Sequence, residues 1–137
     1  MKNSKQVRVI TYGSFDILHR GHIRLIERAR ALGDYLIVGL STNEFNHVKG
    51  KISVFDYKDR AVVLKSLRAV DKVIPERTWE QKIRDVRRYK VDVFAIGSDW
   101  KGKFNFLKPY CRVVYLPRTK GISTSEVKSR ILKIKRI

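Results

Sequence analysis

The chain has 137 residues, of which 31 are Lys or Arg and 13 are Asp or Glu, so its formal net charge at pH 7 is +18. This length suits one domain, residues 1–137, with a core of its own. Hydrophobic residues make up 43% of the chain, which excludes a disordered basic tail. The charge predicts a polyanionic partner, and nucleic acid, an acidic membrane surface and phosphate-rich substrates all fit it.

The one cysteine, Cys111, excludes an intramolecular disulfide and a zinc site built from cysteine pairs. No apolar stretch approaches the ~20 residues that a membrane-spanning helix needs. The polar residues 1–6 lead into a strand pattern and predict no signal peptide. We therefore expect a cytoplasmic protein.

Strands and helices are predicted to alternate along the chain. The patterns first predict a strand at 7–12, a helix at 21–32, a strand at 35–40, a helix at 56–68 and a short strand at 72–74 that Pro75 ends. They then predict a helix opened by Thr78 with Gln81, strands at 91–96 and 112–116, and a helix opened by Ser123 with Glu126. Residues 41–55 are interpreted as a long mobile loop with room for a short helical turn.

This alternation predicts a single-domain α/β protein, a Rossmann-like three-layer α/β/α fold with a five-stranded parallel sheet. Ligands of such sheets bind outside the carboxyl ends of the strands, near the point where the strand order reverses. The segments that follow the strands are therefore the candidates for function, namely 13–22, 41 onward, 97–103 and 117–124.

The first strand runs into the segment 11–22, TYGSFDILHRGH. Gly13 lets the chain turn, and Gly21 leaves room for a phosphate to approach the backbone. His19 and His22 lie where the first helix begins, and free N–H groups and the helix dipole favour anions there. Both imidazoles can therefore point at one phosphate. The alternatives are a helix cap at His19 and an apolar-face residue at His22, whereas a zinc site lacks a third ligand.

The pattern Gly-Ser-Phe-Asp-x-x-His-x-Gly-His at 13–22 resembles the signature of the nucleotidyltransferase superfamily with the His-x-Gly-His motif. Four later segments narrow the resemblance to the glycerol-3-phosphate cytidylyltransferase family: RxVD at 68–71, WEQK at 79–82, GxDW at 97–100 and RTxGIST at 118–124. The resemblance covers residues 9–131. It implies that CTP and glycerol 3-phosphate give CDP-glycerol and pyrophosphate, for teichoic acid synthesis, in a homodimer that uses Mg²⁺ as the CTP complex.

The resemblance also implies the roles of individual residues. The catalytic residues are His19, His22, Lys49 and Arg118. The CTP-binding residues are Ser14, Phe15, His19, Arg20, Gly21, His22, Lys51, Asp99, Arg118, Thr119, Gly121, Ile122, Ser123, Thr124 and Ser125. The acceptor-binding residues are Lys49, Lys82 and Arg68, and no side chain is expected to ligate a metal. The family usually has Thr at position 14, where Ser keeps the hydroxyl, and we expect Asp16 to hold the motif loop together.

The residues suit this chemistry. A phosphate oxygen is already ionised at neutral pH, so the reaction needs neither a general base nor a covalent intermediate. Catalysis then depends on positioning and on stabilising negative charge, which cations and backbone donors can do. Charged loop residues such as Lys49 and Lys51 are usually exposed to solvent, and the resemblance favours a role in phosphate binding over that alternative.

Two other functions remain open at this point. One is a cytidylyl- or adenylyltransferase that acts on another alcohol phosphate. The other is a non-catalytic basic module that binds nucleic acid, supported by basic clusters at 84–90 and 128–136 but not by any nucleic-acid-binding motif. We expect no specific nucleic acid partner, and we expect the surplus charge to give weak association with anionic membrane or polymer surfaces.

Overall fold

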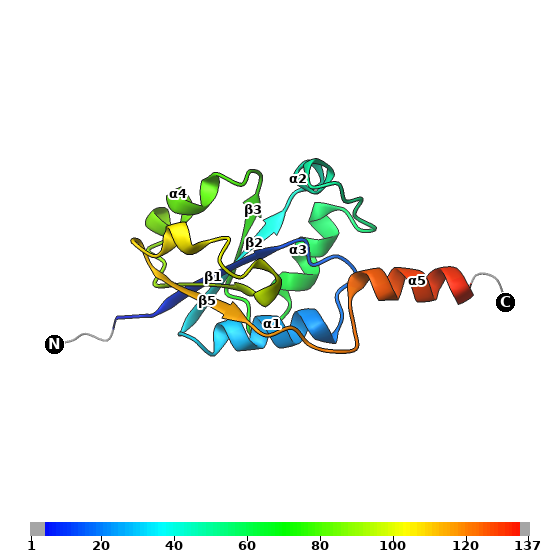
Figure 1. The fold of residues 1–137 in the computed structure, drawn as a ribbon, viewed down its shortest axis with the longest axis horizontal. Coiled ribbons are helices and arrows are strands. Elements are labelled where there is room, and N and C mark those ends of the chain that lie inside the picture. Colours follow the sequence, from blue (N-terminus) through cyan, green and yellow to red (C-terminus); the bar gives the residue numbers. More distant parts are fainter. Residues whose placement is uncertain (1–4, 135–137) are drawn as a thin grey trace.

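The computed structural model describes residues 5–134 and contains a central sheet with helices on both sides (Figure 1). The strands are β1 (Arg8–Gly13), β2 (Tyr35–Ser41), β3 (Lys72–Glu76), β4 (Val93–Gly97) and β5 (Arg112–Leu116). The helices are α1 (Arg20–Arg30), α2 (Asn43–Val48), α3 (Tyr57–Lys65), α4 (Gln81–Arg88) and α5 (Thr124–Ile134), and two 3₁₀ turns lie at Ser98–Trp100 and Asn105–Leu107.

The five strands are parallel and lie in the order β3-β2-β1-β4-β5. One face of the sheet is covered by α1 and α3, through Ile26 and Leu64 among others. The other face is covered by α4 and the segment 98–107, through Val86 and Phe104. The predicted α/β/α architecture is therefore confirmed, and the strand order reverses between β1 and β4.

The prediction that Pro75 ends the third strand was wrong. Pro75 lies inside β3, paired with Leu40, and β3 continues to Glu76, which pairs with Ser41. β3 is an edge strand, where proline is tolerated because a strand at the edge can leave an N–H position unpaired. As a consequence, the carboxylate of Glu76 reaches the carboxyl edge of the sheet.

The segment predicted to be a loop contains a helix, α2, whose start is capped by the Thr42 hydroxyl accepting from the Phe45 amide over 3.1 Å. The start of α4 was also predicted wrongly. It begins at Gln81, and its Oε1 accepts from the amides of Arg77 and Thr78. Gln81 thus pins the turn before the helix and does not lie in a first turn opened by Thr78.

The C-terminal helix α5 extends away from the body of the molecule (Figure 1). Its start is as predicted, because the Ser123 hydroxyl accepts from the Glu126 amide over 3.1 Å. Its predicted apolar side is not packed into the core, since Ile131 and Ile134 are both exposed. Among residues 5–134, no helix is long and apolar enough to cross a membrane.

Candidate active site

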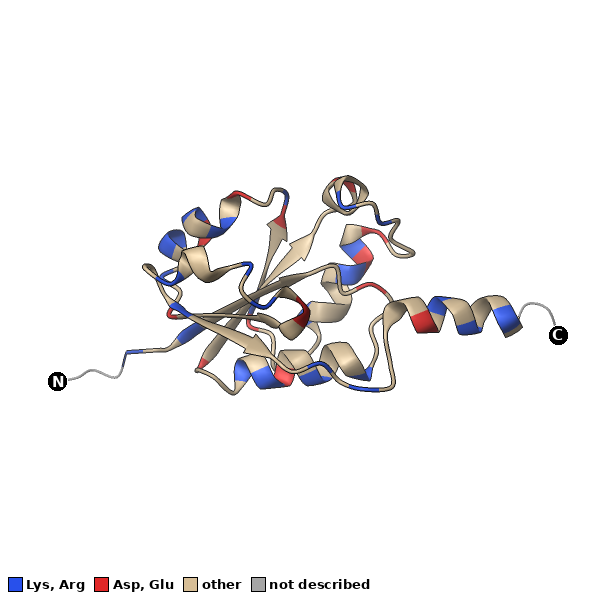
Figure 2. Ribbon diagram, in the orientation of Figure 1, with Lys and Arg blue, Asp and Glu red and all other residues tan. Residues whose placement is uncertain are grey.

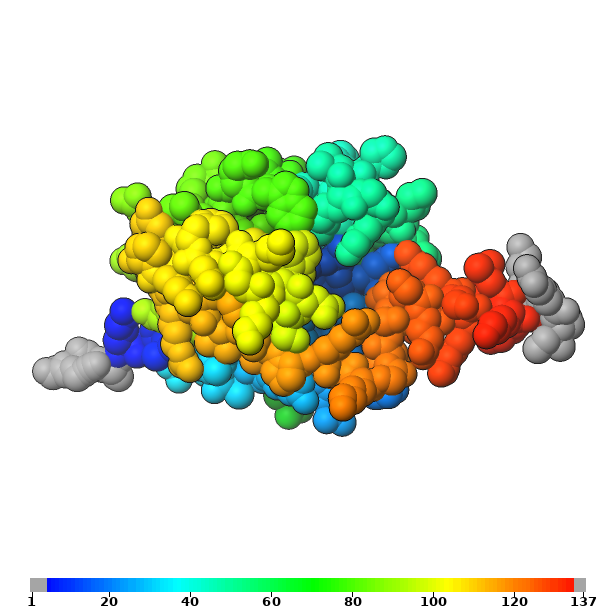
Figure 3. All heavy atoms as spheres, viewed as in Figure 1, coloured from blue at the N-terminus to red at the C-terminus, as the bar shows by residue number. Residues whose placement is uncertain are grey.

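A pocket of about 330 Å³ opens at the carboxyl edge of the sheet. Its walls come from the segments after β1, β4 and β5, together with part of the segment after α2. In Figure 3 it is the hollow where the blue β1 segment is visible between the teal, yellow and orange parts of the chain. The pocket lies where the strand order reverses, as predicted for ligands of a parallel sheet.

The loop between β1 and α1 is held in an unusual backbone conformation. Phe15 and Ile17 have φ angles of 45° and 49°, a left-handed region that costs energy for residues other than glycine. Between them, the Asp16 carboxylate accepts from the amides of Val54 at 2.6 Å and Phe55 at 3.0 Å. Asp16 thus ties this loop to the segment after α2, which confirms its expected structural role.

Both motif histidines cap α1 with one ring nitrogen and point the other toward the pocket. His19 Nδ1 accepts from the Gly21 amide at 3.0 Å, and His22 Nδ1 accepts from the His19 amide at 3.1 Å. A Cβ at Gly21 would lie 2.8 Å from His19 Cε1, so glycine makes room for this ring. Because each Nδ1 accepts a backbone proton, a neutral ring carries its own proton on Nε2.

The two Nε2 atoms converge on one place, which the Thr124 hydroxyl occupies. Thr124 Oγ1 lies 3.3 Å from Nε2 of His19 and 3.5 Å from Nε2 of His22. Burial lowers the pKa of His22 to about 4, with a further contribution from His19 nearby, and burial also lowers the pKa of His19. Both rings are therefore neutral N–H donors near pH 7.

The hydroxyl of Ser14, directly after β1, lies between Asn46 on α2 and Lys49, which follows α2. It donates to Asn46 Oδ1 at 2.6 Å, and Lys49 Nζ donates to it at 3.5 Å. Lys49 also donates to Ser41 Oγ at 2.8 Å. Burial lowers the pKa of Lys49 to about 8, although the carboxylate of Glu76 opposes this shift. Lys49 is therefore still mostly an ammonium ion at neutral pH.

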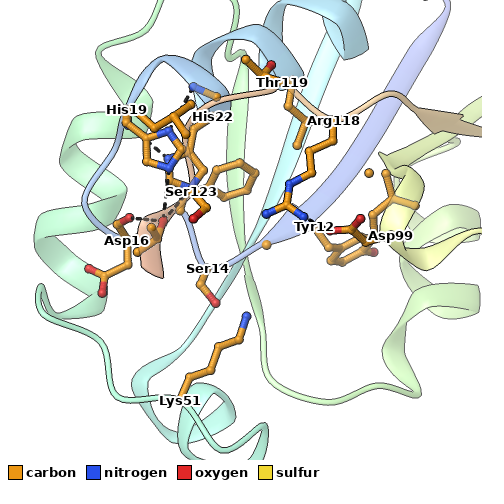
Figure 4. A pocket seen from close by; sticks show the side chains of 18 of the residues that line it. Tyr12, Ser14, Asp16, His19, His22, Lys51, Asp99, Arg118, Thr119 and Ser123 are labelled. Atoms are coloured by element: carbon orange, nitrogen blue, oxygen red, sulfur yellow. Dashed lines mark hydrogen bonds and ion pairs between the residues drawn. The ribbon is translucent and has the colours of Figure 1, made fainter. Parts of the chain in front are cut away.

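Other cations reach the pocket from opposite walls. Lys51 lies on the segment after α2 and extends toward Ser14 (Figure 4). Arg118 follows β5, and its Nη1 lies 3.6 Å from Oδ2 of Asp99, which follows β4. Both partners of this pair are well exposed, so the pair adds little to stability and can open for a ligand.

The segment between β5 and α5 forms the remaining wall. Gly121 has a φ angle of +84°, as expected for the turn that this glycine was predicted to make. The following residues begin α5, and Ser123 and Thr124 at its start line the pocket. An N-terminal helix end of this kind favours an anion.

Most of the predicted site residues come together in this pocket. Those that line it are Ser14, Phe15, His19, Gly21, His22, Lys51, Asp99, Arg118, Thr119, Ile122, Ser123 and Thr124. Lys49 adjoins it through Ser14. Arg20, Gly121 and Ser125 flank it in sequence, outside the lining.

Two predicted acceptor-binding residues are not among those that line this pocket. Lys82 is buried, with 1% of its side chain exposed and its Nζ 2.6 Å from Oε2 of Glu76, a carboxylate whose other oxygen lies 4.0 Å from Lys49 Nζ. Arg68 follows α3 at the amino end of β3, where it lines a separate shallow depression with α1 residues such as Glu27 and Arg30. The fold therefore separates Arg68 from the site by the length of the sheet.

Sequence reasoning missed several polar residues that support the site. The most connected is Arg60, which is 2% exposed and donates to the carbonyl oxygens of Ser14 at 2.9 Å, Ser41 at 2.7 Å and Phe55 at 2.8 Å. Asn46 links Ser14 to the Ser53 hydroxyl, 2.6 Å from its Nδ2. Neither belongs to a recognised motif, and only the position of their segments after β2 could have drawn attention to them.

The described residues do not form a protein-held metal site. Within residues 5–134, no group of three or more His, Cys, Asp or Glu side chains is placed to hold a metal ion. Asp16 is the carboxylate beside the histidines, and its two oxygens already accept backbone amides. A divalent cation at this pocket would have to be held chiefly by a ligand's own phosphates.

Comparison with known proteins agrees with this geometry. A family model described as cytidylyltransferase-like matches residues 10–130. The chain belongs to this cytidylyltransferase-like family. It is 59% identical over 121 residues to a glycerol-3-phosphate cytidylyltransferase of Bacillus spizizenii, covering 88% of this chain and 94% of that protein. It is 57% identical to one of Staphylococcus aureus, covering 90% and 94%.

A solved structure from this fold group supports the architecture. The crystal structure of a lipopolysaccharide core biosynthesis protein from Thermoplasma volcanium matches with a TM-score of 0.75 and 29% sequence identity. The match covers 85% of this chain and all of that one. The sequence matches thus confirm the resemblance inferred from the motifs, and the structural match confirms the fold.

Proposed function

We propose that this protein transfers the cytidylyl group of CTP to sn-glycerol 3-phosphate, giving CDP-glycerol and pyrophosphate. The observation that carries the proposal is the convergence of two histidine Nε2–H donors on one point beside Thr124. That arrangement suits an α-phosphate whose negative charge grows during reaction. The high identity to two glycerol-3-phosphate cytidylyltransferases supports the choice of substrates.

The reaction is a direct displacement at the α-phosphorus. An oxygen of the acceptor phosphate forms a bond to this phosphorus, while the bond from the phosphorus to the bridging oxygen of the β-phosphate breaks. Pyrophosphate leaves with that electron pair, so no proton has to move. His19 and His22 donate to the α-phosphate oxygens, which would take the place of the Thr124 hydroxyl.

The remaining cations divide between the two substrates. Lys51 and Arg118 face the pocket from opposite walls, which suits the β- and γ-phosphates of CTP and the leaving pyrophosphate. Lys49, beside Ser14, suits the phosphate of the acceptor. If Mg²⁺ takes part, the phosphates of CTP would hold it and it would reduce their negative charge.

The assay for this proposal measures pyrophosphate release with CTP or ATP, each combined with several alcohol phosphates. We expect turnover with CTP and sn-glycerol 3-phosphate, and little with ATP or with longer polyol phosphates. Turnover that requires a different nucleotide or acceptor would support the alternative, another nucleotidyltransferase of the same superfamily.

We further propose that the protein is a cytoplasmic homodimer, which serves teichoic acid synthesis. The exposed apolar side chains Val62 and Val63 on α3 offer surface for a second copy. Light scattering after size-exclusion chromatography should give twice the 16.1 kDa mass of one chain. A mass of 16.1 kDa at micromolar concentration would contradict the dimer.

Weak attraction to anionic surfaces is proposed for the surplus charge. Lys and Arg residues follow one another along α1 and α4 (Figure 2). The exposed arginines there are Arg24 and Arg28 on α1 and Arg84, Arg87 and Arg88 on α4. Binding to vesicles that contain acidic lipid should be weak and should weaken further with salt. Binding to a nucleic acid with an affinity that falls steeply with salt would instead favour the alternative of a nucleic-acid-binding module, and absent or salt-insensitive binding in a mobility assay would rule that alternative out.

A further inference from the structure

Three cationic residues line the pocket, and the motifs give a role to two of them. The three are Lys51, Arg118 and Lys128. Lys51 and Arg118 lie on the segments after α2 and β5, whereas Lys128 lies on α5, one helical turn after Thr124. In the sequence, Lys128 belongs only to the basic cluster at 128–136, so the fold alone brings it to the pocket.

The helical spacing puts Lys128 on the same side of α5 as the reaction centre. Residues four apart share one side of a helix and lie about one turn, or 5.4 Å, apart along its axis. Lys128 therefore shares a side with Thr124, whose hydroxyl occupies the point where the two histidine Nε2 atoms converge. Helical side chains lean toward the N-terminus of their helix. A phosphate chain that starts at the histidines and follows α5 outward would meet Lys128 next.

The ammonium group of Lys128 reaches across to the opposite wall of the pocket. Its Nζ donates to the carbonyl oxygen of Ile52 at 3.3 Å. Because Ile52 directly follows Lys51, this contact brings two lysines to one rim of the pocket. The Ile52 side chain is 81% exposed, so this rim is on the solvent side. Two like charges that meet at a rim attract an anion to the space between them.

The carboxylates near Lys128 have other partners. Of the two that line the pocket, Asp16 accepts backbone amides with both oxygens, and Asp99 pairs with Arg118 at 3.6 Å. On α5 itself, Glu126 pairs with another residue of the helix over 3.2 Å. Within residues 5–134, no carboxylate forms an ion pair with Lys128, whose hydrogen bond goes to a neutral carbonyl. A phosphate oxygen would be a better partner, because it adds the attraction of opposite charges.

We propose that Lys128 is a further nucleotide-binding residue, whose ammonium group leaves the Ile52 carbonyl and binds the terminal phosphate of CTP. This inference rests on the proposed function, in which the α-phosphate lies at the histidines. The γ-phosphate is then the one that reaches the rim where Lys51 and Lys128 meet. The same contact would stabilise the negative charge of the leaving pyrophosphate.

A purely structural role of Lys128 would have a different consequence. If its contact with Ile52 served only to hold Lys51 in place, Lys128 would contribute nothing to binding once Lys51 is removed. A direct contact with the phosphate would persist in that background. A double-mutant cycle separates the two cases, because it measures the coupling between the two lysines.

The experiment measures the Kd of CTP and of CMP by titration calorimetry at one fixed salt concentration. CMP lacks the β- and γ-phosphates, so it reports binding of the base, the sugar and the α-phosphate alone. The variants are Lys128→Met and Lys128→Arg, each also made in a Lys51→Met background. The control is Lys133→Met, which removes an exposed lysine from the same helix. Melting temperatures check that each variant is folded, and the readout needs no turnover.

We expect Lys128→Met to weaken CTP binding about tenfold or more, as for the loss of a hydrogen bond between charged groups, and to change the Kd of CMP less than about twofold. Lys128→Arg keeps the charge and should stay within about threefold of the parent for both nucleotides. In the Lys51→Met background, Lys128→Met should still weaken CTP binding by about fivefold or more. Lys133→Met should match the parent.

Three results would overturn the inference. They are an unchanged Kd of CTP in Lys128→Met, equal losses for CTP and CMP, and a loss that disappears in the Lys51→Met background. The proposed function is tested separately. If the variants showed the expected pattern with CTP but the parent released no pyrophosphate with glycerol 3-phosphate, the choice of acceptor would be rejected and the role of Lys128 would stand.

Discussion

The backbone amide of His19 donates a hydrogen bond to Nδ1 of His22 over 3.1 Å, so the second motif histidine caps the helix that the first one begins. His19 Nδ1 in turn accepts from the Gly21 amide. Each ring therefore caps the helix with Nδ1, and the catalytic role that we propose for it uses the other nitrogen, Nε2. The cap at His19, one of the alternatives in the sequence, is confirmed, and it leaves the proposed phosphate donor free on the same ring.

The two roles can be separated by choosing the replacement. In His19→Asn and His22→Asn, the side-chain oxygen can take the place of Nδ1 and keep the cap, while the Nε2–H donor is lost. We expect near-parent melting temperatures with kcat reduced about 10²–10³-fold, the usual effect of losing one such donor. In the Gln variants, the side-chain amide can reach the Nε2 position, and part of the activity should return. Asn variants with near-parent kcat would contradict the assigned donors.

Asp16→Asn should loosen the segment that carries Lys51. The carboxylate accepts from two backbone amides, and a side-chain amide has one oxygen with which to replace two. We expect the free energy of unfolding to fall by about 1–3 kcal/mol and the KM for CTP to rise. Chemical denaturation and steady-state kinetics measure the two effects.

Asp56→Asn is the matched control for this loss of charge. Asp56 is exposed, lies on the same segment and, among the described residues, makes no side-chain capping bond. It should change neither stability nor KM noticeably. Equal effects of the two substitutions would indicate a general charge effect and not a tie between loops.

Gly121→Ala tests the turn between β5 and α5. Alanine at a φ of +84° is strained, and its Cβ would lie 3.3 Å from Arg20 Nη2. Gly102 has nearly the same φ, +83°, and no described atom lies within 4 Å of its Cβ position. Both variants should lose about 1 kcal/mol of stability. Only Gly121→Ala should also raise the KM for CTP, and the same rise in Gly102→Ala would speak against a site-specific role.

The positions of the strands and the His-x-Gly-His motif after β1 could be predicted from the sequence because both depend on local patterns. Buried parallel strands appear as apolar runs, and the residues after β1 carry a recognisable spacing. Glu76 was missed for a local reason too. The sequence pattern predicts that Pro75 ends its strand, because nothing near it in sequence shows that β3 is an edge strand where proline fits.

The position of Lys82 could not be predicted because it depends on contacts distant in sequence. On a helix, a lysine is normally an exposed residue, and the WEQK segment gave it a presumed ligand role. Its burial results from rings at Tyr12, Trp79 and Phe104, which three separate segments bring together. Arg68 is the opposite case. It belongs to a segment that resembles a family motif, yet the fold places it at the end of the sheet opposite the pocket.

Burial of His22 should make the protein less stable in mild acid. The pKa of His22 falls to about 4 in the folded protein, chiefly because the ring is buried, whereas an unfolded chain gives histidine a pKa of about 6.5. Between these two values the unfolded chain binds a proton that the folded protein does not. Stability should therefore decrease as the pH falls from 6.5 toward 4, by about 3 kcal/mol from this residue.

His22→Asn removes this titration and keeps an acceptor for the His19 amide. Urea denaturation at a series of pH values should show a shallower loss of stability in His22→Asn than in the parent, with the two curves running parallel above pH 7. A variant with His47, which is exposed on α2, replaced by Asn should follow the parent curve. Parallel curves for His22→Asn and the parent across the acid range would contradict the prediction. They would mean that the His22 ring is protonated as easily in the folded protein as in the unfolded chain. Burial would then not lower its pKa, and the assignment of His22 as a neutral N–H donor would be wrong.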